Sequence, residues 1–136
     1  MGGSKIHVID LEDFSISYIS IGVTPRAVVL SPDNTKMYVT LNLSGKVAAW
    51  DLVAHKSLGT VTTGKAARSL AVSSDGSALF VVNFTSNSVS KVRTSDLKVL
   101  QTVKACNEPI GITFDTPTQR TWVACYGGSI KIFDNK

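Results

Sequence analysis

Charged side chains are scarce in this chain, and long apolar runs are missing from it. Asp, Glu, Lys and Arg make up 18% of the 136 residues, against 43% hydrophobic residues, a balance typical of a folded domain and not of a disordered chain. No apolar run approaches the ~20 residues that a helix needs to cross a bilayer, so we expect no membrane span. The two cysteines, Cys106 and Cys125, form neither a CxxC pair nor the spacing of a zinc finger.

The formal net charge is +4, but the basic residues are scattered along the chain and are not interleaved with aromatic residues. Proteins that bind nucleic acid usually gather positive charge on one face, so we expect no nucleic-acid partner. Met1 is followed at once by Gly2-Gly3-Ser4 and a β-patterned run, which indicates no signal peptide. The compartment is therefore left open by the chain itself.

The chain repeats itself every 42 residues. Pro25-Arg26-Ala27, Ala67-Arg68-Ser69 and Pro109-Ile110-Gly111 open three successive copies of one pattern at that spacing. Repeats of this length that contain short β-patterned runs are typical of propeller blades or β-arrays.

Each repeat contains four short apolar segments separated by turn residues, which predicts four strands, A to D. The pair Asp75-Gly76, between A and B of the second repeat, is a strong hairpin signal because both residues tolerate a positive φ. The predicted strands of the first complete repeat are residues 26–30, 36–41, 46–51 and 56–62; those of the second are 69–72, 78–82, 88–93 and 98–103. The third repeat supplies A, B and C at 110–114, 120–125 and 129–134, and the N-terminus supplies C and D at 5–10 and 15–21.

Apolar residues fall on both faces of these strands, and no helical spacing is sustained anywhere. A sheet of this kind must be covered on both sides, as sheets that stack face to face are. The prediction is an all-β fold, a β-propeller arc of about three four-stranded antiparallel blades in one partial domain of residues 1–136. Its segments are 1–21 (strands C and D of a split blade), 22–63, 64–104 and 105–136 (strands A to C of a split blade).

The turn and the second strand of the repeat carry a further pattern. Ser31-Pro32-Asp33-Asn34 leads to Tyr38-Val39-Thr40-Leu41, and Ser73-Ser74-Asp75-Gly76 leads to Phe80-Val81-Val82-Asn83. These residues resemble the YVTN-type β-propeller repeat family, which is named for a Tyr-Val-Thr-Asn at this place. Trp50-Asp51 is similar to the dipeptide of WD repeats, but the glycine-histidine half of that signature is missing, so we rank WD repeats second.

The resemblance implies a fold more strongly than an activity, because similar propellers serve as surface proteins, binding scaffolds and lactone hydrolases. The chain shows no complete catalytic constellation, and we predict a non-catalytic binding or scaffold module without a cofactor. The alternative is a lactonase-like hydrolase that uses a bound cation. The resemblance also makes an extracytoplasmic location an expectation.

Propellers typically close with four to eight blades, and this chain holds about three. An open arc leaves sheet edges and faces that can pair with another chain. We expect self-association, with a homodimer that forms a six-blade ring; the other interpretation is a piece excised from a longer propeller.

In propellers that this chain resembles, the D–A and B–C loops share one face around the central channel, and that face usually binds. The tentative ligand-binding residues are there: Arg26, Arg68, Asn107, Glu108 and Tyr126. The equivalent arginines could attract an anionic small molecule or a protein partner. The competing interpretation is structural, with each arginine stacked on a neighbouring blade or paired with Glu108.

Cys106 and Cys125 should lie near that face as well. They could form a disulfide, bind a soft metal or remain free thiols, and free thiols are the simplest interpretation. Two cysteines alone make a weak metal site, so we predict no metal centre. The aromatic column Tyr38, Phe80 and Trp122 is interpreted as core between blades.

Overall fold

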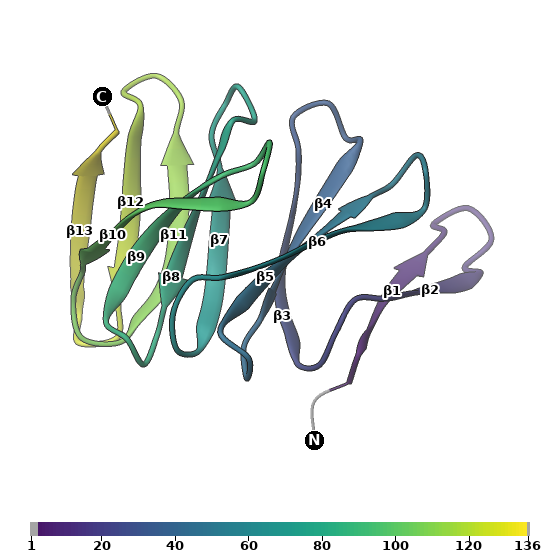
Figure 1. Ribbon diagram of the computed structural model, residues 1–136, viewed down its shortest axis with the longest axis horizontal. Coiled ribbons are helices and arrows are strands. Elements are labelled where there is room, and N and C mark those ends of the chain that lie inside the picture. The colour runs from purple at the N-terminus through teal and green to yellow at the C-terminus, as the bar shows by residue number, and fades with distance from the viewer. Residues whose placement is uncertain (1–2, 136) are drawn as a thin grey trace.

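Residues 3–135 fold into thirteen strands that form four antiparallel sheets of two, four, four and three strands. The computed structural model describes residues 3–135, and no helix occurs among them. Within each sheet the strands pair in chain order, each with the next along the chain. The sheets stand side by side, from the N-terminal pair β1 and β2 to the C-terminal group β11 to β13 (Figure 1).

The first two sheets contain β1 (Lys5–Ile9) and β2 (Ile16–Ser20), then β3 (Pro25–Leu30), β4 (Lys36–Leu41), β5 (Lys46–Asp51) and β6 (Lys56–Thr62). The last two contain β7 (Ala67–Val72), β8 (Ala78–Asn83), β9 (Ser88–Arg93) and β10 (Lys98–Lys104), then β11 (Pro109–Asp115), β12 (Arg120–Cys125) and β13 (Ser129–Asp134).

The sheets lie close together at their first strands and spread apart toward their last strands. Neighbouring sheets contact one another mainly through their first strands, β3 with β7 and β7 with β11, whereas the outer strands β6 and β10 barely meet. Sheets that touch at their inner strands and diverge outward have the arrangement of propeller blades. The predicted β-propeller arc is therefore confirmed as the fold class.

The predicted strands agree with the structure to within one residue at each end, except at the start of β7, which begins at Ala67, two residues earlier than predicted. Strands β3 and β11 also begin one residue earlier, at Pro25 and Pro109. The register between A and B shifts at the same repeat position in all three sheets, just after Pro25, Ala67 and Pro109. A β-bulge interrupts the alternation of side chains, so the sequence pattern becomes regular only after it.

Apolar residues from opposite faces of each sheet form the core. Tyr38 and Val47 of one sheet pack against Leu79 and Val81 of the next, in a cluster of buried residues. On its other face the same sheet packs against the two-stranded sheet, which contributes Ile6. Because every interior sheet is covered on both sides, the strands have apolar residues on both faces, as the sequence pattern indicates.

The aromatic column is core in two of its three positions. Tyr38 and Phe80 are 1% and 3% exposed, and the Phe80 ring stacks on Phe114 of the next sheet, with 5.5 Å between centroids. Trp122 is 38% exposed, so the prediction is wrong for this residue. No sheet follows β11–β13 among the described residues, and the face that holds Trp122 has nothing to pack against.

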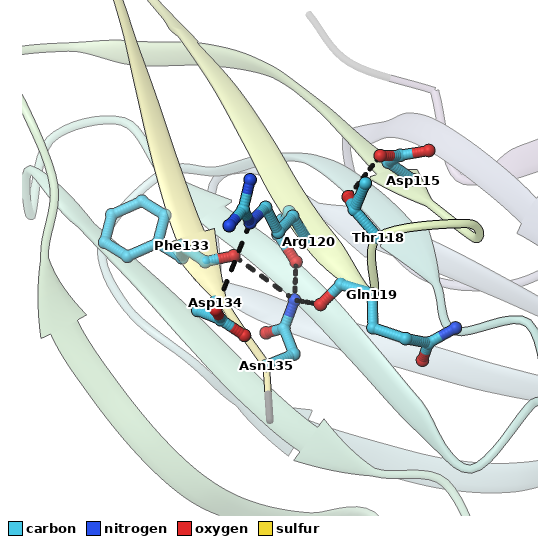
Figure 2. A network of polar contacts seen from close by, with 8 residues as sticks. Asp115, Thr118, Gln119, Arg120, Phe133, Asp134 and Asn135 are labelled. Atoms are coloured by element: carbon cyan, nitrogen blue, oxygen red, sulfur yellow. Dashed lines mark hydrogen bonds and ion pairs between the residues drawn. The ribbon is translucent and has the colours of Figure 1, made fainter.

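The C-terminal strand is held to its neighbour by polar side chains (Figure 2). The Asn135 amide donates hydrogen bonds to the Gln119 carbonyl at 3.1 Å and to the Thr121 hydroxyl at 2.7 Å. An ion pair joins Arg120 to Asp134 at 4.0 Å across the same two strands. These contacts fix the end of β13 against β12.

The Ser-x-Asp turns between strands A and B are built from short hydrogen bonds. The Ser31 hydroxyl donates to Asp33 at 2.5 Å and accepts from the Lys36 backbone N–H at 2.9 Å. In the next repeat Ser73 donates to Asp75 at 2.6 Å, and the Ser77 backbone N–H donates to the same carboxylate. The serine thus joins the turn to the start of strand B, which explains its place in the motif.

The third A–B turn uses the same chemistry in a different order. Asp115 stands where the first two repeats have serine, and it accepts a hydrogen bond from the Thr118 hydroxyl (Figure 2).

These turns predict a loss of stability in acid. The serine hydroxyl above all, and then the N–H and hydroxyl two residues further on, lower the pKa of Asp33 and of Asp75 from 3.8 to about 2. Because the folded pKa lies below the unfolded one, the stabilisation is present above about pH 4 and is lost as the pH falls through 2. We expect the double variant Asp33→Asn/Asp75→Asn to be less stable at pH 7 and to lose less stability than the wild type on acidification.

Urea midpoints measured between pH 7 and pH 2 test this prediction. Glu12→Gln, an exposed substitution outside these turns, is the control. Identical pH slopes for the double variant and the wild type would contradict the assignment.

Candidate functional site

One end of the sheets carries the predicted site. Because the strands are antiparallel, β3, β7 and β11 begin where β4, β8 and β12 end. We call this end the loop face, and define it by the segments 21–24, 63–66 and 105–108 and the turns 42–45, 84–87 and 126–128.

One backbone conformation recurs on the loop face. Thr24, Ala66 and Glu108 are 42 residues apart and have positive φ values of 55°, 56° and 52°. The carbonyl of each accepts a backbone hydrogen bond of 3.0 Å from the first residue after strand B, which is Asn42, Phe84 or Tyr126. Left-handed backbone is costly for these residue types, so the surrounding hydrogen bonds must hold it in place.

The two equivalent arginines lie at the second position of β3 and of β7. The guanidinium of Arg68 lies over the Phe84 ring, 4.8 Å from its centroid, a cation–π contact within its own sheet. Arg26 is exposed, and its side chain makes no hydrogen bond or ion pair with any residue from 3 to 135. Pairing with Glu108 is not observed for either arginine within this range.

The three remaining predicted site residues lie together beside β11. Glu108 donates its backbone N–H to the Asn87 side chain at 2.8 Å, while its carboxylate has no partner in the described part of the chain. Asn107 is exposed, and Tyr126 is 71% exposed. They share the loop face with the arginines, but the structure provides no contact between the two groups.

A wide hollow on the loop face was missed by sequence reasoning. It is an open groove of about 630 Å³ between the two four-stranded sheets, and Lys65 is its only charged lining residue. Its walls come from two B–C turns and the D–A segment between them: Asn42, Leu43, Ser44, Gly45, Thr62, Gly64, Lys65, Ala66, Thr85 and Ser86. Turn residues such as these carry no distinctive sequence signal, so only the spacing of the sheets reveals the groove.

A second feature of the loop face is a junction between the segment before strand A and the end of strand B. It joins a pair of positions that recur every 42 residues: Gly22 with Leu41, Gly64 with Asn83, and Cys106 with Cys125. A Cβ added at Gly22 would lie 2.7 Å from the Leu41 side chain, and one at Gly64 would lie 2.6 Å from that of Asn83. The glycines are therefore required by close approach in the first two repeats.

In the second repeat the junction is a buried polar network. Asn83 is completely buried; it accepts a hydrogen bond from Thr63 at 2.9 Å and donates to Ser88 and Ser90 at 3.1 and 3.0 Å. Ser90 also donates to the Thr63 carbonyl at 3.2 Å. A buried amide is tolerated because its donors and acceptor are satisfied.

In the third repeat the same junction is a disulfide. The Cys106 and Cys125 sulfurs are bonded at 1.98 Å, with the Cα atoms 6.1 Å apart. Free thiols, the interpretation that the sequence favoured, are therefore not what the structure has. The register places Pro109 opposite Cys125, so the segment that leads into β11 brings Cys106 within bonding reach.

Within residues 3–135 no three His, Cys, Asp or Glu side chains gather as a metal-binding group. No described segment forms a helix long and apolar enough to cross a membrane.

No family model and no curated protein matches the sequence. Among solved structures, hydrazine synthase of Kuenenia stuttgartiensis is similar at 27% identity over 82% of this chain and 32% of its own, with a TM-score of 0.79. The WD40 repeats of RRP9 are similar at 17% identity over 82% of this chain and 35% of theirs, with a TM-score of 0.75.

A third similar structure is the dihydro-heme d1 dehydrogenase NirN in complex with DHE. It matches at 20% identity over 98% of this chain and 33% of its own, with a TM-score of 0.73. The chain thus spans about a third of the length of each of these three structures. The chain has the fold of a partial β-propeller.

The junction yields a prediction about stability. A disulfide that closes a loop of about 20 residues should stabilise the fold by about 3 kcal/mol through its effect on the unfolded chain. We expect Cys106→Ser/Cys125→Ser to lower the free energy of unfolding by about that amount. The variant Cys106→Gly/Cys125→Leu installs the pair of the first repeat, and should recover packing but not the cross-link.

Urea denaturation without reductant measures both variants. Addition of reductant to the wild type should reproduce the loss seen for the serine variant. A wild type whose unfolding is insensitive to reductant would contradict the prediction.

Proposed function

We propose that the protein is a non-catalytic β-propeller binding module whose loop face binds an anionic ligand. The observation that carries this proposal is a set of cations on the loop face without acidic partners. Arg26, Lys65 and Arg68 form no ion pair with any described residue. Among residues 3–135 the cations that form ion pairs are Arg93, with Asp96, and Arg120, with Asp134. What distinguishes the three loop-face cations is therefore their place around one groove.

The position of each cation supports capture of a carboxylate or phosphate. Lys65 lines the groove between two sheets, and the arginines enter the inner strands on either side of it. Stacking on Phe84 fixes the plane of the Arg68 guanidinium but leaves its N–H edges available for charge-assisted hydrogen bonds. The groove has the volume of a site for a small molecule or a short peptide segment.

Glu108, Asn107 and Tyr126 form the polar margin of the proposed site. The unpaired carboxylate of Glu108 would repel an anion that approached from the side of β11. An anionic ligand should therefore lie over the first two complete repeats, with the third at its edge.

We also propose that the chain is a member of the YVTN-type repeat family. The Ser-x-Asp turns and the Tyr-Val-Thr and Phe-Val-Val segments support membership of the YVTN-type repeat family. Self-association into a closed ring is also proposed, because the described sheets leave open edges with which a second chain could pair. The disulfide supports a place in an oxidising, extracytoplasmic compartment.

The binding proposal predicts the effect of removing the arginines. Arg26→Ala/Arg68→Ala should weaken the binding of a fluorescent oligoglutamate peptide by about tenfold or more, since each lost charge-assisted contact is worth about 1.5–3 kcal/mol. Fluorescence anisotropy at low and at physiological salt measures the affinity, and the wild type should bind more weakly as salt increases.

The matched control is Lys56→Ala/Lys98→Ala. These lysines are also 42 residues apart and begin β6 and β10, at the opposite end of the sheets. The control removes the same net charge, so an equal loss of binding in both variants would show nonspecific attraction and would refute the proposed site.

A further inference from the structure

Three equivalent backbone N–H groups on the loop face differ in their hydrogen bonds. They belong to the left-handed residues Thr24, Ala66 and Glu108, which are 42 residues apart. The Thr24 N–H donates to the Gly3 carbonyl at 2.9 Å, and the Glu108 N–H donates to the side-chain oxygen of Asn87 at 2.8 Å. The N–H of Ala66, which is half-buried, makes no hydrogen bond with any residue from 3 to 135.

The residue that supplies the acceptor before β11 is a glycine before β7. Asn87 and Gly45 are 42 residues apart, and both have left-handed backbone, with φ values of 53° and 64°. The Asn87 side chain reaches the Glu108 N–H from this position, whereas Gly45 has no side chain with which to reach Ala66. Gly45 and Ala66 both line the loop-face groove, so the place of the missing acceptor lies at this groove.

Close approach of two segments prevents the chain from filling that place from residue 45. A Cβ added at Gly45 would lie 2.4 Å from the carbonyl oxygen of Gly64, which is a backbone atom. Any other residue there would therefore force the turn 42–45 away from the segment 63–66. The packing of these two segments keeps the Ala66 donor accessible from the groove, whose walls belong to the two four-stranded sheets.

Two further donors line the same groove. The Ser86 hydroxyl accepts a hydrogen bond from the Lys65 backbone N–H at 2.8 Å, which leaves its own proton for a ligand. The Lys65 ammonium supplies the only charge among the lining residues and forms no ion pair within residues 3–135. An N–H, a hydroxyl and an ammonium group without an acidic neighbour suit an acceptor oxygen that carries negative charge.

We infer that the groove binds a carboxylate, one oxygen of which accepts a hydrogen bond from the Ala66 N–H as the Asn87 oxygen does from Glu108. The ligand class so assigned rests on the proposed anion binding at the loop face. The Asn87 carboxamide is planar, a shape that a carboxylate shares and a tetrahedral phosphate does not. The charge of Lys65 favours a carboxylate over a neutral amide. An acidic side chain of a peptide and a free organic acid both present this group.

Amide NMR of the full chain tests the contact, because Glu108 provides a matched control within the same molecule. Titration with the blocked tripeptide Gly-Asp-Gly should shift the Ala66 amide proton downfield until the site is saturated. The Glu108 amide proton should not move, since it is already bonded to Asn87. Hydrogen exchange at Ala66 should slow by about tenfold or more, because exchange then requires a charge-assisted hydrogen bond to open.

An Ala66 amide that neither shifts nor slows at saturating tripeptide would overturn the inference. An equal response of the Glu108 amide would also overturn it, because the effect would then not depend on an available donor.

Three further probes separate the classes and sources of ligand. Inorganic phosphate is a tetrahedral anion, and the blocked tripeptide Gly-Asn-Gly presents a neutral amide of the same shape as the carboxylate. Tighter binding of either one than of Gly-Asp-Gly would refute the assignment of a carboxylate. Acetate presents the carboxylate alone: an affinity equal to that of Gly-Asp-Gly indicates a free acid, and a weaker one indicates a peptide segment. Both of these results support a carboxylate site.

A substitution at the equivalent acceptor tests the comparison between the two donors. Asn87→Gly removes the acceptor from Glu108 at a position whose left-handed backbone glycine adopts without strain. We expect hydrogen exchange at Glu108 to become several-fold faster and to approach that of Ala66. The control is Asn34→Gly, the same substitution at a left-handed, exposed residue in the first A–B turn, which should leave both amides unchanged. A Glu108 amide that remains protected in Asn87→Gly would contradict the role assigned to Asn87.

Failure of this contact and failure of the proposed function give different results. Oligoglutamate binding that depends on Arg26 and Arg68, without a response at Ala66, leaves the proposed function and removes the carboxylate contact. A response at Ala66 that is unchanged in Arg26→Ala/Arg68→Ala leaves the contact and removes the role of the arginines. The absence of both oligoglutamate binding and a response at Ala66 overturns the two together.

Discussion

The packing of one sheet's apolar face against the next sheet is the constraint on which the rest of this structure depends. A sheet with apolar residues on both faces is stable only when a neighbour covers each of them. The two four-stranded sheets satisfy this requirement through the clusters around Tyr38 and around Met37. The sheet β11–β13 satisfies it on one side, which is why Trp122 remains exposed. The two-stranded sheet covers only part of the first four-stranded sheet, so Val28 on β3 also remains exposed.

The same packing fixes where the polar side chains lie. Since each sheet is a near copy of its neighbour displaced around a common side, residues 42 positions apart occupy equivalent places. Arg26 and Arg68 enter neighbouring inner strands, and Lys65 lies in the groove between the sheets. The positions of these cations thus follow from the 42-residue repeat as well as from the individual residues.

Most of the fold could be predicted from the sequence, and less of the site. The 42-residue period and the turn residues were enough to predict the strands, because each repeat supplies a register check on the others. The stack of Arg68 on Phe84 and the bond between Cys106 and Cys125 depend on which loops a bulged strand pair brings together. Spacing along the chain does not encode that geometry. The exposure of Trp122 reflects the lack of a sheet beyond β11–β13 among the described residues, which the repeat pattern did not reveal.

The junction before strand A shows that equivalent positions can be closed by unrelated chemistry: an apolar contact at Leu41, an amide network at Asn83 and a covalent bond at Cys125. Each of these contacts is weakened by a different change in conditions. A change in redox potential acts on the third blade alone and leaves the two preceding blades untouched. Reducing conditions should therefore destabilise the C-terminal sheet, which contains the disulfide, and should not affect the corresponding contacts in the two four-stranded sheets.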